Sequence, residues 1–566
     1  MFLPITKEEI VKLNWDYIDI ILVTGDAYID HPSFGTAVIG RSLEDAGFRV
    51  AILPQPNWRD DLRDFKKLGA PRLFFGVTSG SMDSMVNHYT AAKRLRSDDA
   101  YTPNNEAGFR PDYATTVYSQ ILKKLYPNTP IILGGIEASM RRLVHYDYWA
   151  DRLFPSILVD SQADMLIYGM GEKVVVELAN KLRKGEKIET IVDLPQTVLA
   201  CDAAKQGDDV IVLPSYEDCK ADKKQQALSM KIIEQNANTY NGKTLVQKHA
   251  TRYVIVNPQD ASFCSADLDK SFDLPYMREP HPKYRKRGAI AAFEMIKHSV
   301  NIHRGCFGGC SFCTIAAHQG RRIISRSEKS ILREIEAISC RSDFRGYLSD
   351  LGGPSANMFK MESRDTDLCI KCAKPSCIFP SVCKNMNNDH QPLIKLYEKV
   401  RLLPYIKKVS ISSGIRYDIF TDYRYFDIVF LHHVSGRLKV APEHTCNNVL
   451  NAMRKPSFDK FIALKERFDM LNKRHNMKQQ LIPYFISSHP ACTLQDMKTL
   501  SSQTAKLGFR LEQVQDFTPT PMTLSSEMYY TSYNPITMKK IYCAKSRQEK
   551  AAQNDTFFWY KKGKSK

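Results

Sequence analysis

The stretch that decides the fold is Arg304-Gly-Cys-Phe-Gly-Gly-Cys-Ser-Phe-Cys313, which spaces three cysteines as C-x3-C-x2-C. Three thiolates this close together can hold three corners of a cubane iron–sulfur cluster. The spacing supplies no fourth ligand, so one iron stays open to a small molecule, as in catalytic metal sites. The three glycines suit a backbone folded tightly around an inorganic core. We expect Cys306, Cys310 and Cys313 to be the ligands and Phe312 to shield one side of the site from water.

This loop resembles the signature of the radical S-adenosylmethionine (SAM) enzymes. In that class the open iron binds the amino and carboxylate groups of SAM, and an electron from the cluster cleaves the sulfonium to give a 5′-deoxyadenosyl radical. The cofactors carry that chemistry, while the protein supplies position and shielding. The competing interpretation is a zinc knuckle or three incidental thiols, because His303 and His318 are near enough to be a fourth ligand.

Composition predicts an ordinary globular chain. Its 566 residues correspond to about three or four domains, and it is 43% hydrophobic and 25% charged. No apolar run approaches the ~18 residues of a membrane span, and the N-terminus carries acidic residues where a signal peptide has an apolar core. We therefore expect a soluble, cytoplasmic protein with no membrane partner. Eight of the 14 cysteines lie between 306 and 383, and such clustering points to metal rather than to disulfides.

The net charge of +18, from 80 Lys and Arg against 62 Asp and Glu, permits a polyanionic partner such as RNA. The basic residues are scattered, apart from short clusters at 283–287 and 561–566. A solvated basic surface is therefore the simpler explanation, and nucleic acid remains the alternative.

Residues 1–190 alternate short apolar runs with helical stretches, which predicts a doubly wound parallel sheet, a Rossmann-like domain. The glycine turns at 134–139 and 169–172 follow two of its strands, where such sheets bind ligands or pack tightly. The pattern resembles the cobalamin-binding-type domain that precedes the barrel in several radical SAM groups. The D-x-H-x-x-G motif that supplies a histidine to cobalt is missing, because Asp30-His31-Pro-Ser-Phe-Gly35 has the wrong spacing. Cobalamin is therefore not expected.

The rest of the chain divides into three further parts. Residues 191–290 are polar and lysine-rich, and we interpret them as a connecting subdomain. A partial (β/α)6 radical SAM barrel is expected over 291–530, with a cysteine-rich insertion at about 365–390 and the cluster loop after its first strand. Residues 531–566 are expected to form a basic C-terminal tail.

Two elements of the barrel are candidate SAM contacts. The second strand ends in Leu351-Gly-Gly-Pro354, and in radical SAM proteins such a turn exposes backbone carbonyls to the SAM amino group. We expect Gly352, Gly353 and Pro354 to form it. Ser412, Ser413 and Arg416 follow a later strand, where they would bind the ribose and carboxylate of SAM. A structural ion pair is the alternative role for Arg416.

A second cysteine group has the spacing C-x2-C-x4-C-x5-C, formed by Cys369, Cys372, Cys377 and Cys383. Four thiolates can close a cubane cluster or a tetrahedral zinc site completely. Its place inside the barrel favours an auxiliary iron–sulfur cluster, with zinc close behind. Four unligated thiols are the third interpretation, because spacing does not guarantee that the side chains converge.

The resemblance becomes specific in longer stretches. Four stretches carry it: His298-Ser-Val-Asn-Ile-His-Arg-Gly-Cys306, Asp350-Leu-Gly-Gly-Pro-Ser-Ala-Asn357, Val23-Thr-Gly-Asp-Ala-Tyr28 and Asp98-Asp-Ala-Tyr-Thr-Pro103. In these the chain resembles the YgiQ-type radical SAM proteins, and the similarity extends to about residue 545. The strand and helix at 438–454 and the stretch 517–523 resemble the methylthiotransferase branch. The resemblance implies a 4Fe–4S cluster, SAM and a reductant such as flavodoxin or ferredoxin, and it leaves the reaction open.

Three functions are consistent with these observations. The first is radical-initiated modification of RNA or protein, which the basic charge and the methylthiotransferase-like barrel favour. Against it, the N-terminal domain lacks the cysteines of the extra methylthiotransferase cluster. The second is radical chemistry on a small molecule. The third is a non-catalytic iron–sulfur or zinc-binding regulatory protein, which the candidate SAM contacts argue against.

Overall fold

The computed structural model describes residues 1–561. Contacts between residues divide the chain into two compact units. The first comprises 1–222 with 239–297, and the second comprises 223–238 with the chain from His298 onward. The segment 223–238 therefore belongs structurally to the C-terminal unit, although 59 residues of the N-terminal unit follow it.

The first unit is built on a nine-stranded sheet in the order β10-β11-β12-β9-β8-β5-β4-β1-β3. Five neighbouring strands are parallel: β3 (Val50–Pro54), β1 (Ile20–Thr24), β4 (Phe74–Thr78), β5 (Ile131–Leu133) and β8 (Met165–Ile167). With the strands counted along the chain, this order is 2-1-3-4-5, that of a flavodoxin-like doubly wound sheet. The predicted parallel sheet is therefore present in this unit.

The sheet continues beyond the region predicted from sequence. β9 pairs antiparallel with β8, and β12, β11 and β10 extend the same edge. The connecting subdomain expected over 191–290 is thus replaced, through 256, by four more strands of the sheet. Burial of the apolar side chains Val198, Leu199, Val254 and Ile255 explains this, because apolar strands stabilise a sheet by covering its open edge. The added strands are β9 (Thr197–Cys201), β10 (Val210–Leu213), β11 (Thr244–His249) and β12 (Arg252–Val256).

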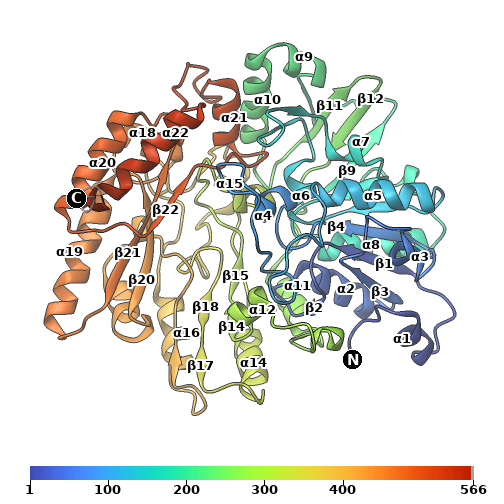
Figure 1. Cartoon of the computed structure of the whole chain (residues 1–566), viewed down its shortest axis with the longest axis horizontal. Coiled ribbons are helices and arrows are strands. Elements are labelled where there is room, and N and C mark those ends of the chain that lie inside the picture. Colours follow the sequence, from blue (N-terminus) through green and yellow to red (C-terminus); the bar gives the residue numbers. More distant parts are fainter. Residues whose placement is uncertain (562–566) are drawn as a thin grey trace. The chain divides into compact units, whose positions relative to one another are not determined.

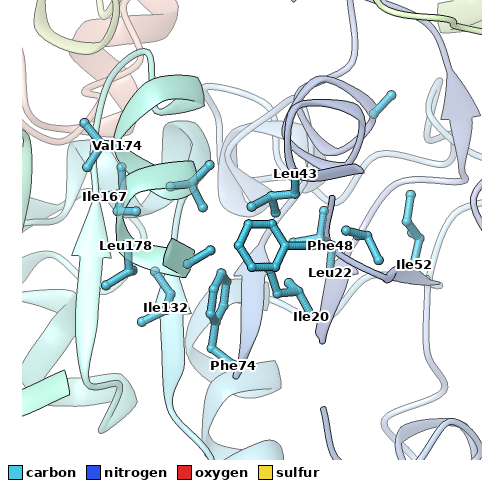
Figure 2. Close-up of a cluster of buried hydrophobic side chains, with 14 of the residues drawn as sticks. Ile20, Leu22, Leu43, Phe48, Ile52, Phe74, Ile132, Ile167, Val174 and Leu178 are labelled. Atoms are coloured by element: carbon cyan, nitrogen blue, oxygen red, sulfur yellow. The ribbon is translucent and has the colours of Figure 1, made fainter. Parts of the chain in front are cut away.

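Helices cover both faces of this sheet. On one face α2 (Gly35–Asp45) and α8 (Glu172–Arg183) pack beside each other. Figure 2 shows Leu178 beside Ile132, and Phe48 between Leu43 and Ile20, all in one buried cluster. Successive strand residues face opposite sides. The alternate residues of β4 and β5 therefore meet α5 (Ala114–Leu125) on the other face.

Most strands of the second unit are parallel and separated by helices. β14 (Ser299–Asn301) pairs with β18 (Asp350–Gly352), β17 (Tyr347–Leu348) pairs with β19 (Lys408–Val409), and β20 (Arg437–Glu443), β21 (Gln480–Ser487) and β22 (Gln513–Asp516) form a three-stranded sheet. The connecting helices are α14 (Glu328–Ser339), α16 (Gln391–Arg401), α19 (Phe458–Arg474) and α20 (Leu494–Lys506). This unit is an α/β arrangement of parallel strands, and its closure into a partial (β/α)6 barrel stays a prediction.

Two segments pack onto the second unit in ways that the sequence did not indicate. Helix α10 (Lys223–Gln235) lies beside α21 (Leu524–Thr531), as Figure 1 shows, and Gln226 Nε2 donates to Glu527 Oε2 at 2.9 Å. The C-terminal segment also packs here, because α22 (Arg547–Asn554) contacts α20 and β21 and buries Gln553. A basic tail was predicted from residue 531. Residues through 561 are instead part of this unit, and 562–566 lie outside the described residues.

None of the helices within residues 1–561 has the length and apolar character needed to cross a membrane.

Candidate active site

A short antiparallel pair of strands supports both ends of the cluster loop. His303 of β15 (His303–Arg304) pairs with Ser325 of β16 (Ile324–Ser325). Just inside this pair, the Cys306 amide donates to the Gly320 carbonyl at 3.2 Å. Gly305 has a φ of +84°, and a Cβ there would lie 2.0 Å from the Arg322 carbonyl oxygen. Only glycine fits this turn, because it alone adopts a positive φ freely and leaves room for the opposing backbone.

The far side of the loop is anchored through Ser311. Its amide donates to the Met453 carbonyl at 3.1 Å, and its hydroxyl donates to the Ala452 carbonyl at 2.7 Å. The Ser525 amide and hydroxyl both donate back to Ser311, to its carbonyl at 2.8 Å and to its Oγ at 2.7 Å. The neighbouring Phe312 is partly buried, and its ring meets His489 edge-on at a centroid distance of 6.1 Å. The predicted shielding residue is therefore held against the protein core.

The three cysteines of the loop are partly buried free thiols. Burial, together with charge on Cys310 and Cys306, raises the pKa of Cys313 to about 12. Burial also raises the pKa of Cys306, while the Arg416 guanidinium opposes that change. The thiols thus interact electrostatically, and binding iron to them must release protons.

The donor set of this loop fits a cubane cluster. Three soft thiolates lie in a glycine-rich turn, and each ligand of a cubane binds a different iron. Within residues 1–561, no three His, Cys, Asp or Glu side chains are grouped to hold a single metal ion. A cubane does not require its ligands to meet at one ion.

Arg416 contacts the cluster loop directly. Its Nη1 donates to Cys310 Sγ at 3.2 Å, and its Nε and Nη2 donate to Asp418 at 3.0 and 2.6 Å. Asn357 fixes the Arg416 backbone by accepting its N–H at 2.8 Å and donating to its carbonyl at 2.9 Å. The ion pair considered from sequence is therefore present, and contact between Arg416 and the SAM carboxylate stays a prediction.

The candidate SAM turn is organised by Asp350, which the sequence analysis did not single out. Its carboxylate accepts the Ser412 and Ser413 amides at 2.8 and 3.2 Å and the Ser413 hydroxyl. The Ser412 hydroxyl donates to the Ser349 carbonyl at 2.8 Å. A Cβ on Gly352 would lie 2.6 Å from Ser413 Oγ. The structure thus brings together the two predicted SAM segments, the turn with Gly352, Gly353 and Pro354 and the segment with Ser412 and Ser413. The sequence signal for Asp350 was its place just before the two glycines.

His303 is a second residue that the sequence analysis named only as an alternative zinc ligand. Its side chain is fully buried, and neither ring nitrogen has a hydrogen-bond partner. Burial lowers the pKa of His303 to about 3, so the ring is neutral. A Cβ on Gly353 would lie 2.4 Å from this ring. A neutral imidazole without a hydrogen-bond partner therefore lies against the glycine turn, although buried polar groups normally have partners.

The second cysteine group lies beside the first. The Cys377 amide donates to the Phe307 carbonyl at 3.1 Å, so a residue of one group contacts the loop of the other. Cys369, Cys372 and Cys383 belong to the same segment as Cys377 and are likewise free and partly buried.

The carboxyl end of the first unit's sheet has a different character. At the switch between β1 and β4, where doubly wound sheets bind ligands, Arg110 donates to the Ser79 carbonyl at 2.6 Å and to Asp26 and Asp99 at 2.8 and 3.3 Å. A Cβ on Gly80 would lie 2.1 Å from Asp26 Oδ1. The crevice between these strand ends is therefore occupied by the protein's own side chains.

The two glycine turns and the Asp30–His31 pair also have structural partners. A Cβ on Gly135 would lie 2.3 Å from Thr78 Oγ1, and one on Gly171 would lie 3.0 Å from Ile167. Asp30 forms a buried ion pair with Arg41. His31 Nδ1 accepts the Ser33 amide at 3.1 Å. Gly135 and Gly171 are therefore packing positions, and Asp30 and His31 are bound within the fold.

Comparison with known proteins identifies the class and then the family. The radical SAM N-terminal family matches residues 2–299, and a second family, the domain of unknown function DUF3362, matches residues 512–563. The chain is thus an enzyme of the radical SAM class. It is 54% identical to UPF0313 proteins of Bacteroides thetaiotaomicron and Porphyromonas gingivalis, over 99% of this chain and 94% and 90% of theirs. A UPF0313 protein of Methanocella arvoryzae is 47% identical, over 96% of this chain and 91% of its own.

The chain belongs to the UPF0313 family, the family of the YgiQ-type proteins, which confirms the resemblance stated from sequence. Two solved structures of the radical SAM methyltransferase TsrM from Kitasatospora setae share its fold at 14% identity and a TM-score of 0.50. They cover 89% and 90% of this chain, and 75% and 74% of their own chains are matched. One holds a tryptophan substrate and the SAM analogue aza-SAM, and the other holds cobalamin and a [4Fe-4S] cluster.

Proposed function

We propose that this enzyme binds a 4Fe–4S cluster through Cys306, Cys310 and Cys313 and uses it with SAM to modify a substrate by radical chemistry. When bound, these cofactors supply the one-electron cleavage of SAM into methionine and a 5′-deoxyadenosyl radical, which abstracts hydrogen from the substrate. The observation that carries the proposal is the contact of three elements in the second unit: the three-thiol loop, the Gly352–Gly353 turn and the Ser412–Arg416 segment.

The protein's own residues have distinct tasks in this proposal. Gly352, Gly353 and Pro354 present backbone oxygens to the SAM amino group, and Asp350 holds that turn against Ser412 and Ser413. The Ser412 and Ser413 hydroxyls already donate within the protein, so they face the ribose as acceptors. Arg416 donates to Cys310 Sγ, and a hydrogen bond to a ligating sulfur tunes an iron–sulfur cluster. Phe312 excludes water from one side.

The favoured substrate is RNA or a protein, because the chain carries a net charge of +18. A small molecule is the second candidate, supported by the tryptophan bound to the fold neighbour TsrM. A flavodoxin or ferredoxin would supply the electron. Cobalamin is not part of the proposal: Asp30 and His31 have structural partners, and Arg110 occupies the switch point of the sheet.

The test is anaerobic reconstitution with iron and sulfide, reduction by dithionite in the presence of SAM, and measurement of 5′-deoxyadenosine. We expect deoxyadenosine from the wild type, and a higher rate when the substrate-containing fraction of a cell extract, RNA, protein or small molecules, is added. A loaded protein that forms no deoxyadenosine with any of the three fractions would contradict the proposal. Incubation with hydroxocobalamin followed by gel filtration should leave no corrin absorbance on the protein.

A further inference from the structure

Helix α15 (Thr366–Ile370) and the loop that joins it to α16 carry four thiols. Cys369 lies in α15, and Cys372, Cys377 and Cys383 follow it in the same loop. Cys377 and Cys383 pack against the same buried apolar cluster, and Cys383, Cys369 and Cys372 all interact electrostatically with Cys377. The other three thiols therefore lie within electrostatic reach of Cys377.

Hydrogen bonds hold this loop in a compact shape. The Cys372 amide donates to the Cys369 carbonyl at 3.1 Å, and the Cys383 amide donates to the Cys377 carbonyl at 2.7 Å. Asn238, which follows the inserted helix α10, donates from Nδ2 to the carbonyls of Cys369 and Cys372 at 2.8 and 2.7 Å. A side chain from far away in the sequence thus fixes the turn that carries the first two thiols.

Two further donors are directed at sulfur. Asn385 Nδ2 lies 3.3 Å from Cys369 Sγ, and the Lys374 amide lies 3.4 Å from Cys372 Sγ. Neutral N–H groups that donate to a thiolate stabilise its negative charge, and such bonds to the sulfurs set the potential of iron–sulfur sites. Four incidental thiols would have no need of this arrangement.

The loop shares its apolar surroundings with the radical SAM loop. Phe307, Met358, Met361, Ile378, Met386 and Ile419 form one buried cluster, against which Cys306, Cys377 and Cys383 pack. The Ser376 hydroxyl donates to the Gly308 carbonyl at 2.7 Å. A Cβ on Gly309 would lie 2.3 Å from the Pro375 carbonyl oxygen. The two thiol groups are therefore adjacent, and the path between them runs from Cys306 to Phe307 and through one hydrogen bond to Cys377.

A partly buried cation, Arg321, interacts with the second thiol group. Arg321 interacts electrostatically with Cys377 and Cys372, and it pairs with Glu234 of α10 at 3.4 Å. Glu234 also pairs with Arg454 at 2.7 Å. Two arginines and one carboxylate leave one net positive charge beside a set of thiolates, which favours an anionic centre there.

We propose that Cys369, Cys372, Cys377 and Cys383 bind a second, fully ligated 4Fe–4S cluster next to the radical SAM cluster. Four thiolates occupy all four irons of a cubane, so this centre has no open position for SAM. It is a one-electron centre, and the path from Cys377 through Phe307 to Cys306 couples it to the catalytic cluster. Its formation does not depend on the reaction proposed above.

The experiment separates the two sites by mutation in the full-length chain. The Cys306→Ala/Cys310→Ala/Cys313→Ala variant keeps only the second site, and the Cys369→Ser/Cys372→Ser/Cys377→Ser/Cys383→Ser variant keeps only the first. After anaerobic reconstitution, iron, sulfide and zinc are measured per chain. We expect about eight irons in the wild type and about four in each variant, since each cubane holds four. A variant with all seven changes should hold no iron.

Three results would overturn the proposal: no iron on the Cys306/Cys310/Cys313 variant, zinc in place of iron on that variant, or no iron lost by the Cys369/Cys372/Cys377/Cys383 variant. If the Cys369/Cys372/Cys377/Cys383 variant does not fold, Asn385→Leu is introduced into the Cys306/Cys310/Cys313 variant instead. Loss of the Asn385 donor should shift the electron paramagnetic resonance signal of the reduced second cluster, and an unchanged signal would count against the site. Because the Cys306/Cys310/Cys313 variant cannot cleave SAM, failure here is distinguishable from failure of the proposed function.

Discussion

The carboxyl ends of the parallel strands differ between the two units. In the first unit, the switch between β1 and β4 is closed by Arg110, whose terminal nitrogens bind Asp26, Asp99 and the Ser79 carbonyl. In the second unit, the end of β18 and the loop after β15 present glycines, thiols and the unpartnered ring of His303. Within the described part of the chain, the first edge pairs the charge of Arg110 with two carboxylates, although Arg110 Nε has no partner, whereas at the second edge both ring nitrogens of His303 are without one.

This difference separates a folding role from a binding role. A buried ion pair that is complete within the protein has its desolvation offset by its partners, and removing one partner is strongly destabilising. A buried polar group without a partner costs free energy that the folded chain does not recover by itself. Natural proteins accept such costs mainly at functional sites. The predictions below test whether chemistry belongs only to the second edge.

The largest effect is expected from removing the cluster ligands. The Cys306→Ala/Cys310→Ala/Cys313→Ala variant should form no 5′-deoxyadenosine above background, because no iron would remain at the three-thiol loop. The measurement is deoxyadenosine by chromatography after reduction with dithionite. Cys340→Ala is the matched control, since Cys340 is exposed and lies outside both cysteine groups. Cleavage retained by the variant lacking all three ligands would place the chemistry elsewhere.

The next effect concerns Asp350, which ties the glycine turn to the Ser412–Ser413 segment. Asp350→Ala removes the acceptor for two amides and one hydroxyl. We expect deoxyadenosine formation to fall by up to about 100-fold, because a displaced binding segment can cost that much. Iron per chain should be unchanged.

Asp422→Asn is the control for Asp350, because Asp422 is also a carboxylate of this unit but forms its ion pair with the exposed Arg424. If Asp350→Ala lost iron and activity together, Asp350 would support the cluster loop rather than the SAM turn.

Smaller effects on stability and on SAM cleavage are expected from a change at His303. His303→Leu removes two buried, unpartnered nitrogens, so the protein without cofactors should be as stable as the wild type or more stable. If SAM forms a hydrogen bond with this ring, deoxyadenosine formation should fall about 10-fold, because losing an interaction of ~1.4 kcal/mol in the transition state lowers a rate by that factor. A purely structural histidine would change stability without changing SAM cleavage, and that outcome would remove His303 from the site.

The stability of the same variant should also depend differently on pH. Burial lowers the pKa of His303 to about 3, against an ordinary value of about 6.5. The unfolded chain therefore binds a proton that the folded chain does not, and the resulting loss of stability grows as the pH falls from about 6.5 toward 3, by about 1.4 kcal/mol per pH unit. Thermal unfolding at pH 7, 6 and 5 should show a shallower decline for His303→Leu. Parallel curves would contradict the assigned burial.

How much of this could be predicted from sequence depended on how local each feature is. Cys306, Cys310 and Cys313 lie within one loop, so their spacing indicated them, and the resemblance to radical SAM proteins pointed to the glycine turn at 352–354. The alternation of strands and helices likewise predicted the parallel sheet. The helix α10 could not be placed, because its partner Glu527 lies 301 residues away from Gln226. The role of Asp350 and the unpartnered state of His303, which the sequence indicated only as an alternative zinc ligand, depend on partners present or absent in three dimensions.

The last prediction tests the first edge, where no change in chemistry is expected. Arg110→Met leaves Asp26 and Asp99 buried without their cation, which should destabilise the protein by about 3–5 kcal/mol. Burial already raises the pKa of Asp26 against the opposing effect of Arg110, so the variant should raise it further. A carboxyl with a raised pKa contributes stability at low pH that is lost as the pH rises through that pKa. The variant should therefore be least destabilised in acid.

The matched control for this edge is Arg110→Met/Asp26→Asn/Asp99→Asn, which removes all three charges and should recover most of the lost stability, as replacing a whole buried ion pair often does. Deoxyadenosine formed per folded chain, measured well below the unfolding temperature, should equal the wild-type value in both variants. If Arg110→Met instead lowered SAM cleavage while its unfolding midpoint stayed unchanged, the first edge would take part in the reaction. The distinction between a closed edge and a reactive edge would then be wrong, because a group can pair its charge within the fold and still act on a ligand.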